Sequence, residues 1–326
     1  MERIALDGLL PSRVGFGCAG IGGYDYGPVD DDDSRRAVAA AWDAGITLYD
    51  VADIYGIGRA ERVLSEGLGA NRHEAVIASK FGVCWDADRK ATYKDHSPEH
   101  LREALEASLR RLRIDCLPIY QVHWPGEPAE VEAALAELVR CRTAGKIRVF
   151  GLCNLDHRHD LAWLAGCGAR TVQMPFSLID QRLASPMRQA RDDHGLRTFA
   201  YNVLGHGLLS GRYGSGDSFT GTDLRTRIHP FQGPDAEAWW TMLDRLKAMA
   251  ADLGTTAGRL AVAWALHQPE VSCALIGIKH ARQVADHAAA GALRLPPDVL
   301  AMIAALVPAT RPHDATKTDG TDDQHA

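Results

Sequence analysis

The chain has 326 residues, of which 46% are hydrophobic and 24% are charged, as is typical of a globular protein with a sizeable core. The formal net charge of −6 argues against a general binder of nucleic acid or anionic membranes. Seven scattered cysteines, none in a C-x-x-C pair, favour reduced thiols over a disulfide or zinc framework. We read no signal peptide and no bilayer-spanning run, so we expect a cytoplasmic protein.

Short apolar runs alternate with helical patterns along most of the chain. Residues 4–10 are expected to form a hairpin, because Asp7-Gly8 is typical of a type I′ turn. Eight strands are predicted after it, at 14–17, 47–49, 75–79, 117–122, 149–152, 171–173, 197–201 and 273–276. Predicted helices cover 33–44, 60–68, 98–112, 129–144, 160–165, 235–253, 257–267 and 281–289, and Ser185-Pro186 opens a further one.

Strand–helix alternation indicates parallel strands with right-handed crossovers, and eight such units predict a closed (β/α)8 TIM barrel. The barrel would carry the N-terminal β-hairpin and an extra C-terminal helix at 297–306. No linker divides the chain, so we expect residues 1–306 to form a single domain. Residues 307–326 are polar and contain Pro and Gly, which predicts a disordered tail.

One glycine-rich motif is also typical of a different fold. Residues 15–20 read G-x-G-x-x-G after a strand, as in Rossmann domains. That motif needs a helix to begin within it, so that the helix N-terminus meets the pyrophosphate. Gly22-Gly23 and Gly27-Pro28 follow here, and no helix can begin before about Asp31. We therefore expect a loop over the barrel mouth.

Residues suited to catalysis follow the predicted strands, at the end where TIM barrels carry their active sites. Asp50 ends the second strand with Tyr55 just beyond, Lys80 ends the third, and His123 follows the fourth. A free tyrosine has a pKa near ~10. A neighbouring lysine would lower that pKa, and a carboxylate would hold the lysine charged. Each residue alone has an ordinary structural explanation, but together they indicate one site.

These segments resemble the aldo-keto reductases over nearly the whole globular part of the chain. The resemblance rests on residues 50–56, 79–82, 121–125 and 151–154, and residues 205–213 and Ile276-Gly277 extend it. It implies a catalytic tetrad of Asp50, Tyr55, Lys80 and His123. Tyr55 would protonate the carbonyl oxygen, Lys80 held by Asp50 would lower the pKa of Tyr55, and His123 would orient the carbonyl.

The resemblance also implies a nicotinamide dinucleotide bound without a Rossmann domain, because no side chain donates hydride. Asn154 and Gln173 match the pair that bonds the nicotinamide carboxamide, and Tyr201 matches the aromatic residue that stacks on the ring. Positions near the pyrophosphate and the adenosine are Leu204, Gly207, Gly277, Lys279, Arg282 and Gln283. Lys279 and Arg282 suit a 2′-phosphate, so NADPH is preferred to NADH, although a solvated helix start would also explain them.

Three departures from the family pattern surround this cofactor site. Cys153 replaces the usual serine before the nicotinamide asparagine, and Asn202-Val203 replaces the serine–proline after the stacking tyrosine. His287 aligns with an asparagine that often closes the adenine pocket, which leaves the adenine contacts open. None of these changes touches the tetrad.

Substrate choice is expected to lie in the loops. Candidate rim residues are Tyr24, Tyr26, Trp85, Trp124, Phe176, His229 and Phe231. Residues 222–231 resemble the loop of bacterial members near the inositol-utilisation and sugar-reductase subgroup, and Arg225 or Arg227 could bind a phosphate. We expect reduction of an aldehyde or ketone, sugar-like or aliphatic.

Other functions stay open at this point. The same site could oxidise a sugar or polyol, or the fold could serve as a cofactor-binding regulatory subunit, as in the β-subunits of potassium channels. His157 and His159 form an H-x-H pair as in metal-dependent hydrolases, but no further ligand set completes it, so no metal is expected. Small-molecule substrates are expected rather than nucleic-acid or membrane partners, and the oligomeric state is left open.

Overall fold

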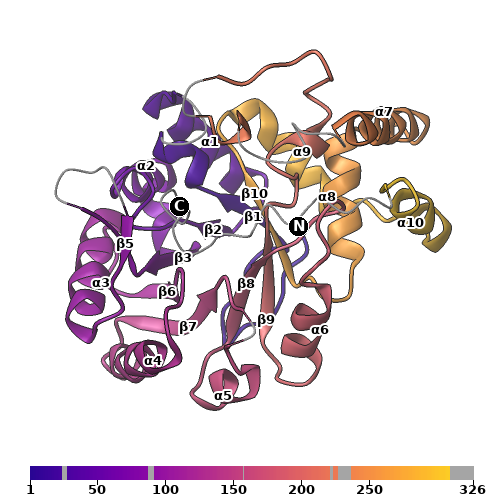
Figure 1. Ribbon diagram of the computed structural model, residues 1–326. Helices are drawn as coiled ribbons and strands as arrows, with labels where there is room; N and C mark the ends of the chain where they lie inside the picture. Colours follow the sequence, from indigo (N-terminus) through magenta and orange to yellow (C-terminus); the bar gives the residue numbers. More distant parts are fainter. Residues whose placement is uncertain (24–27, 87–91, 157, 221–222, 227–235, 309–326) are drawn as a thin grey trace.

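The computed structural model describes the whole chain except residues 24–27, 87–91, 157, 221–222, 227–235 and 309–326, so the predicted tail lies almost wholly outside the described residues. Eight parallel strands close into a barrel in the order β1-β10-β9-β8-β7-β6-β3-β2, which confirms the predicted fold (Figure 1). They are β1 (Val14–Gly17), β2 (Leu48–Asp50), β3 (Val76–Phe81), β6 (Leu117–Val122), β7 (Ile147–Cys153), β8 (Thr171–Pro175), β9 (Arg197–Tyr201) and β10 (Cys273–Gly277).

Helices surround the ring of strands, as Figure 1 shows. They are α1 (Asp31–Asp43), α2 (Arg59–Leu68), α3 (Pro98–Leu112), α4 (Pro128–Thr143), α5 (Leu161–Gly166), α6 (Ala184–Asp192), α7 (Ala236–Asp252), α8 (Ala257–His267), α9 (Ala281–Ala290) and α10 (Pro297–Ala304). Helix α3 has the predicted bounds because the Ser97 hydroxyl accepts the His100 amide at 3.2 Å, and Pro98 needs no amide partner.

The N-terminal hairpin closes one end of the barrel. Leu6 and Leu9 exchange two backbone hydrogen bonds around Asp7 and Gly8, which both have positive φ, as a type I′ turn requires. The two leucines form one apolar cluster with alternate residues of the strands, namely Leu48, Val76, Ala78, Ile119, Val149, Phe199, Cys273 and Leu275. This cluster fills the amino end of the barrel and leaves the carboxyl end for a site.

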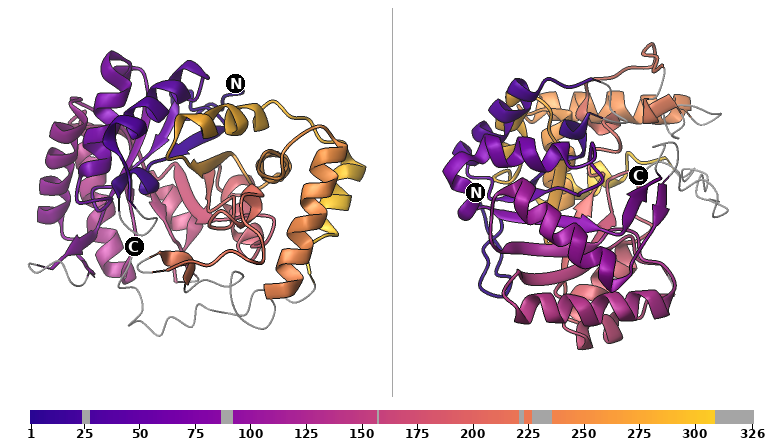
Figure 2. Two further views of the ribbon diagram at one scale, coloured as in Figure 1. Left: turned by 90° about the horizontal axis from the view of Figure 1, so that it is seen from above. Right: turned by 90° about the vertical axis from the view of Figure 1, so that its left-hand side faces the viewer.

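Two details bear on the predicted loops. Only a short 3-10 turn, η1 (Ala19–Gly22), follows β1 before α1 begins at Asp31, so the G-x-G-x-x-G segment makes no Rossmann helix. A two-stranded antiparallel hairpin that was not predicted, β4 (Val83–Trp85) and β5 (Thr92–Lys94), projects from the carboxyl end of β3 (Figure 2).

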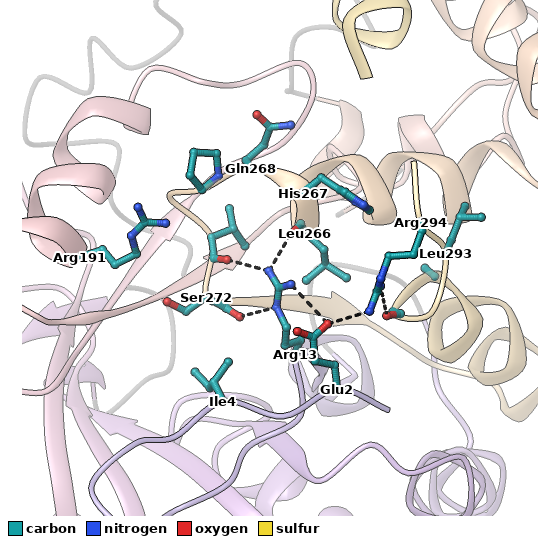
Figure 3. A pocket seen from close by; sticks show the side chains of 14 residues that line it. Glu2, Ile4, Arg13, Arg191, Leu266, His267, Gln268, Ser272, Leu293 and Arg294 are labelled. Carbon is teal, nitrogen blue, oxygen red and sulfur yellow. Dashed lines mark hydrogen bonds and ion pairs between the residues drawn. The ribbon is translucent and has the colours of Figure 1, made fainter. Parts of the chain in front are cut away.

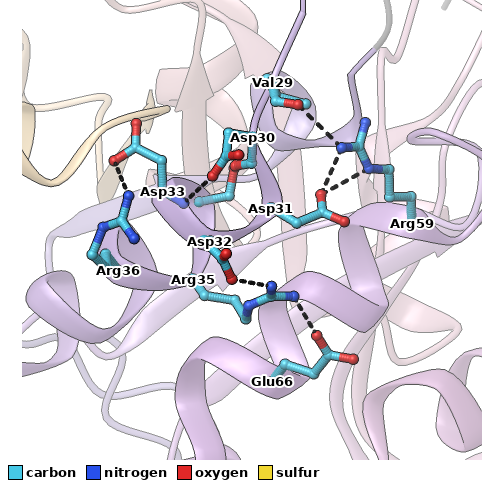
Figure 4. Close-up of polar contacts among 10 residues, drawn as sticks. Val29, Asp30, Asp31, Asp32, Asp33, Arg35, Arg36, Arg59 and Glu66 are labelled. Atoms are coloured by element: carbon cyan, nitrogen blue, oxygen red, sulfur yellow. Dashed lines mark hydrogen bonds and ion pairs between the residues drawn. The ribbon is translucent and has the colours of Figure 1, made fainter.

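Charged side chains fix the start of α1 (Figure 4). The Asp30 carboxylate accepts the Asp33 amide at 2.8 Å as an N-cap. Arg59, at the start of α2, donates to Asp31 at 2.9 Å, and Arg35 pairs with Glu66 of α2 at 2.7 Å. These contacts join α1 to α2, the helix that follows the Tyr55 loop.

A cavity of about 510 Å³ lies at the amino ends of β1 and β10 (Figure 3). The Arg13 guanidinium spans it and donates to the carbonyls of Leu266, Val271 and Ser272 at 2.6, 3.1 and 3.2 Å. It therefore joins the segment after α8 to the start of β1, at the opposite end of the barrel from the predicted site. No helix in the described part of the chain has the length and hydrophobicity to cross a membrane.

Candidate active site

Lys80 is the buried centre of the predicted site. It lies one residue before the end of β3 and is 1% exposed. Its ammonium is 2.8 Å from Oδ1 of Asp50, the last residue of β2, and donates to the Val51 carbonyl at 3.0 Å. Because Asp50 is itself 5% exposed, this is a buried ion pair between neighbouring strands.

Tyr55 and His123 reach the same place from other elements. The Lys80 ammonium lies 5.1 Å from the centre of the Tyr55 ring. The His123 ring meets the Tyr55 ring edge-on, with centres 5.7 Å apart and an angle of 81°. His123 directly follows β6, and its amide donates to the Phe81 carbonyl at 2.9 Å. The four residues of the predicted tetrad are therefore adjacent, and Tyr55 is the most exposed of them.

Charges at the site follow from burial and from the ion pair. Burial opposes the charged form of Lys80, but attraction to Asp50 and Tyr55 outweighs it and raises the pKa of Lys80. Burial and the Lys80 charge hold the pKa of His123 well below its usual range. At neutral pH the site thus contains a lysine ammonium beside a neutral imidazole.

Lys80 acts to lower the pKa of Tyr55 as expected, but burial has the larger effect. Burial raises the pKa of Tyr55 above its usual value, and Asp50 and Cys153 add to the rise. The Lys80 charge acts in the predicted direction but is the smaller effect. Desolvation wins because the phenol lies among buried groups, so Tyr55 keeps its proton at neutral pH and is available as a donor.

The predicted nicotinamide residues lie beside the tetrad. The Asn154 amide nitrogen donates to the His123 carbonyl at 3.0 Å, and its oxygen accepts the Tyr201 hydroxyl at 2.6 Å. An amide side chain can make further hydrogen bonds, so Asn154 retains a donor hydrogen and a lone pair. Gln173 is 3% exposed, and its Oε1 is buried without a hydrogen-bond partner among the described residues.

Cys153 is buried before Asn154, and burial raises the pKa of its thiol. It is therefore a neutral weak donor in place of the family serine.

The loop after β9 carries the predicted pyrophosphate residues. Leu204 lies near its start, and Gly207 has a φ of +98°, a conformation that favours glycine. A Cβ atom on Gly207 would lie 3.2 Å from the Tyr213 ring, so the backbone is packed closely there. Arg225 lies over the same Tyr213 ring at 4.9 Å and makes two contacts to Asp223 at 2.8 and 2.5 Å.

The predicted adenosine residues follow β10. Gly277 is exposed at the strand end, and Arg282 is exposed on the first turn of α9. Gln283 is partly committed to structure, because its Oε1 accepts the amides of Lys279 and His280 at 2.9 Å each. Burial and the nearby charge of Arg225 lower the pKa of Lys279. The Asp223 carboxylate, which pairs with Arg225, opposes this effect on Lys279.

Of the predicted rim residues that the structure describes, two lie near Tyr55 and one is buried in the core. Trp85 and Trp124 pack with Tyr55 around the apolar residues Ala52, Ile54 and Val83, and the rings of His123 and Trp124 are 6.4 Å apart. Phe176 is not a rim residue: it is 1% exposed and stacks on Trp264 with ring centres 5.9 Å apart. Tyr24, Tyr26, Arg227, His229 and Phe231 lie outside the described residues.

The H-x-H segment is described only in part. His159 is 8% exposed and lies 3.0 Å from the Asp156 carboxylate, while His157 lies outside the described residues. Within the described ranges no three His, Cys, Asp or Glu side chains are arranged to hold a metal ion.

Comparison with known proteins decides the family. The model described as Aldo/keto reductase family matches residues 13–308. This chain belongs to the aldo-keto reductase family. It is accordingly an oxidoreductase of the class that uses nicotinamide cofactors and acts on carbonyl or CH-OH groups.

Individual relatives of this aldo-keto reductase differ in cofactor. It is 29% identical over 279 residues to the Schizosaccharomyces pombe aldo-keto reductase yakc, named for NADP(+), covering 84% of this chain and 82% of that one. It is 31% identical over 300 residues to the Escherichia coli NADH-specific methylglyoxal reductase, covering 86% and 89%. The solved glycerol dehydrogenase AKR11B4 from Gluconobacter oxydans superposes with a TM-score of 0.86 at 29% identity, covering 94% of each chain.

Two side chains near the site of this aldo-keto reductase make contacts that the sequence does not predict. Arg225 was named only as a possible phosphate ligand, and its packing on Tyr213 depends on a long loop without a repeating pattern. Glu61 is fully buried near β3, a position that the predicted site does not include. A glutamate among the apolar positions of a helix beside the Tyr55 motif is the signal that could have found it.

Proposed function

We propose that this aldo-keto reductase is an NADPH-dependent enzyme that reduces an aldehyde or ketone, with Tyr55 as the general acid. The observation that carries the proposal is the position of Lys80. Its ammonium is 2.8 Å from Asp50 and 5.1 Å from the centre of the Tyr55 ring, beside a neutral His123. A buried cation next to a protonated phenol stabilises the phenolate that forms when the proton leaves.

In this proposal each tetrad residue has one task. Tyr55 gives its proton to the carbonyl oxygen of the substrate, and Lys80 stabilises the developing phenolate. Asp50 keeps Lys80 charged and in place. His123, neutral at physiological pH, donates a hydrogen bond that orients the carbonyl, as positioning of this kind favours reaction.

The residues present fit a nicotinamide dinucleotide. Gln173 Oε1 has no hydrogen-bond partner in the described structure, and Asn154 retains bonding capacity, so both can hold the carboxamide. Tyr201 would stack on the ring, and the segment from Leu204 to Gly207 would meet the pyrophosphate. When bound, the reduced cofactor supplies the hydride.

NADPH is proposed over NADH because of the cations near α9. Lys279 and Arg225 lie close together, and Arg282 is exposed on the first turn of α9. A 2′-phosphate would bring negative charge to these groups. The yeast relative named for NADP(+) supports this choice, whereas the relative named as NADH-specific supports the alternative, so both cofactors belong in the assay. Gly277 and Gln283 would border the adenosine.

The proposed substrate is sugar-like or aliphatic. Trp85 and Trp124 provide an apolar wall beside Tyr55 and His123. The relatives named for methylglyoxal and glycerol are consistent with small oxygenated substrates. The structural relative named as a glycerol dehydrogenase also favours a second candidate, oxidation of a polyol at the same site. We further propose that residues 1–306 are one domain, and seven free thiols support a reducing, cytoplasmic setting.

The test is an initial-rate assay with NADPH and, in parallel, NADH. The panel contains aliphatic aldehydes, 2-oxoaldehydes, ketones, aldoses and ketoses, and the reverse reaction uses glycerol and other polyols with NADP+ or NAD+. Reduction with a higher kcat/KM for NADPH supports the proposal. Cofactor binding without turnover in either direction would contradict it and favour a regulatory protein.

A further inference from the structure

A buried ionic group lies behind Lys80 and takes no part in the proposed tetrad. Glu61 on α2 is fully buried, and its two carboxylate oxygens reach different elements. Oε1 accepts a hydrogen bond from the Ser79 hydroxyl at 2.7 Å, and Oε2 lies 2.5 Å from Nε of Arg111 on α3. Because Ser79 directly precedes Lys80 in β3, one side chain joins the strand end that bears Lys80 to two helices.

Arg111 also contacts the loop that carries Tyr55. Gly58 ends that loop with a φ of +75°, and a Cβ atom there would lie 2.5 Å from Cδ of Arg111. The Gly58 amide donates to the Asp53 carbonyl at 2.7 Å, and the Asp53 amide donates to the Lys80 carbonyl at 3.4 Å. The loop therefore lies between the stem of Arg111 and the end of β3.

Asp53 lies beside this group and is partly exposed as a residue. Its Oδ1 is buried and has no hydrogen-bond partner within the described chain. Burial, with the negative charge of Glu61, raises the pKa of Asp53 to about 8, while Arg111, a hydrogen bond to the Ile54 backbone and Lys80 oppose the rise. With a pKa of about 8, Asp53 is mostly protonated at pH 7, because desolvation and a neighbouring carboxylate both oppose its charged form.

Two further titratable groups face Asp53. Burial is the largest cause of the raised pKa of Tyr120 of β6 and of Cys84 of β4, and the negative charge that Asp53 carries when it is ionised raises both further. Both stay neutral at pH 7, so the charges that act on Asp53 there are those of Glu61, Arg111 and Lys80.

We propose that Glu61 and Arg111 form a brace that positions Lys80 against Tyr55, with the Asp53 carboxyl beside it. Glu61 and Arg111 act through Ser79 and through the Asp53–Gly58 loop, so they are positioning residues, and the proposal rests on the reductase function proposed above. When Asp53 ionises, a second negative charge, besides that of Asp50, acts on the Lys80 ammonium. The ammonium then stabilises the Tyr55 phenolate less, and reduction slows.

The first test compares Glu61→Gln with Glu66→Gln, the same change on the same helix. Glutamine at position 61 keeps an oxygen for Ser79 but removes the charge that pairs with Arg111. Glu66 is exposed and pairs with Arg35 at 2.7 Å (Figure 4). We expect kcat to fall about tenfold to a hundredfold in Glu61→Gln with KM for NADPH little changed, since a small misplacement of catalytic groups costs this much. Glu66→Gln should keep the wild-type kcat.

A pH profile separates positioning from a general loss of structure. In the wild type, kcat/KM for reduction should fall as the pH rises through about 8, where Asp53 ionises. Removing the like charge of Glu61 lowers the pKa of Asp53, so the fall should move to lower pH by roughly one unit in Glu61→Gln. It should disappear in Asp53→Asn. The infrared band of a protonated carboxyl, lost in Asp53→Asn, reports the same titration without turnover.

Arg111 provides a second route if Glu61→Gln folds poorly. Arg111→Lys keeps a cation beside Glu61 and should retain more of kcat than Arg111→Gln. A wild-type kcat and pH profile in folded Glu61→Gln, or equal rates in the two Arg111 variants, would overturn the brace. If the wild type reduces no carbonyl compound, the proposed function fails. If the infrared titration of Asp53 is the same in wild type and in Glu61→Gln, the proposed brace is contradicted independently of turnover.

Discussion

Replacing Lys80 with methionine should destabilise the protein and inactivate it. Lys80 and Asp50 are 1% and 5% exposed, and their charged atoms are 2.8 Å apart, so the substitution leaves a buried carboxylate without its cation. Breaking a buried ion pair from one side costs about 3–5 kcal/mol. We expect this loss in the free energy of unfolding of Lys80→Met at pH 7, measured by urea denaturation.

The double variant Asp50→Asn/Lys80→Met distinguishes the loss of the ion pair from the loss of side-chain packing. Replacing both partners of a buried pair is often close to neutral, so the double variant should regain most of the stability. It should nevertheless remain inactive, because Tyr55 has no ammonium beside it. In Lys80→Met alone, burial keeps the pKa of Asp50 above its unfolded value, so the loss of stability should be smaller at pH 5 than at pH 8. A single variant within about 1 kcal/mol of wild type, or a double variant no more stable than the single, would refute this reasoning.

Three further predictions concern the cofactor, the histidine and the α3 cap. Lys279→Gln should raise KM for NADPH by about tenfold and leave KM for NADH nearly unchanged, because a charged hydrogen bond to phosphate is worth about 1.5–3 kcal/mol; equal effects on the two cofactors would argue against a 2′-phosphate contact. The pKa of His123 is held well below its unfolded value of 6.5, so its contribution to stability is present above that value and lost as the pH falls below it. Stability measured from pH 7.5 to 5 should therefore fall less in His123→Gln than in wild type, and parallel curves would contradict this. Ser97→Ala removes the acceptor of the His100 amide and should cost about 1 kcal/mol in urea denaturation without a change in kcat, whereas Ser97→Asp should keep the cap.

The barrel could be predicted because its strands and helices alternate regularly. The eight strands are apolar runs bounded by turn residues, and all are found in parallel pairing within two residues of their expected bounds. Residues at strand ends were predictable for the same reason, since parallel strands bring their carboxyl ends to one edge of the barrel. Asp50, Lys80 and His123 are adjacent on that account.

Other features depend on packing that no short pattern encodes. The β4–β5 hairpin has strands of three residues each, too short for an alternation to be recognised. Phe176 lies just beyond a strand end but turns into the core to stack on Trp264. The raised pKa of Tyr55 reflects the burial of the whole site, which sequence alone does not give. The same holds for Glu61, whose partners come from β3 and α3.

Single-turnover reduction by Tyr55→Phe tests the acid assignment most directly. Phenylalanine keeps the ring that lies beside Lys80 and His123 but removes the proton donor. The enzyme saturated with NADPH is mixed with the best substrate of the panel, and hydride transfer is followed by loss of NADPH absorbance. We expect the rate to fall at least about a hundredfold, the usual contribution of a general acid, while NADPH binding measured by fluorescence is unchanged. A wild-type rate of hydride transfer in Tyr55→Phe would show that another group supplies the proton.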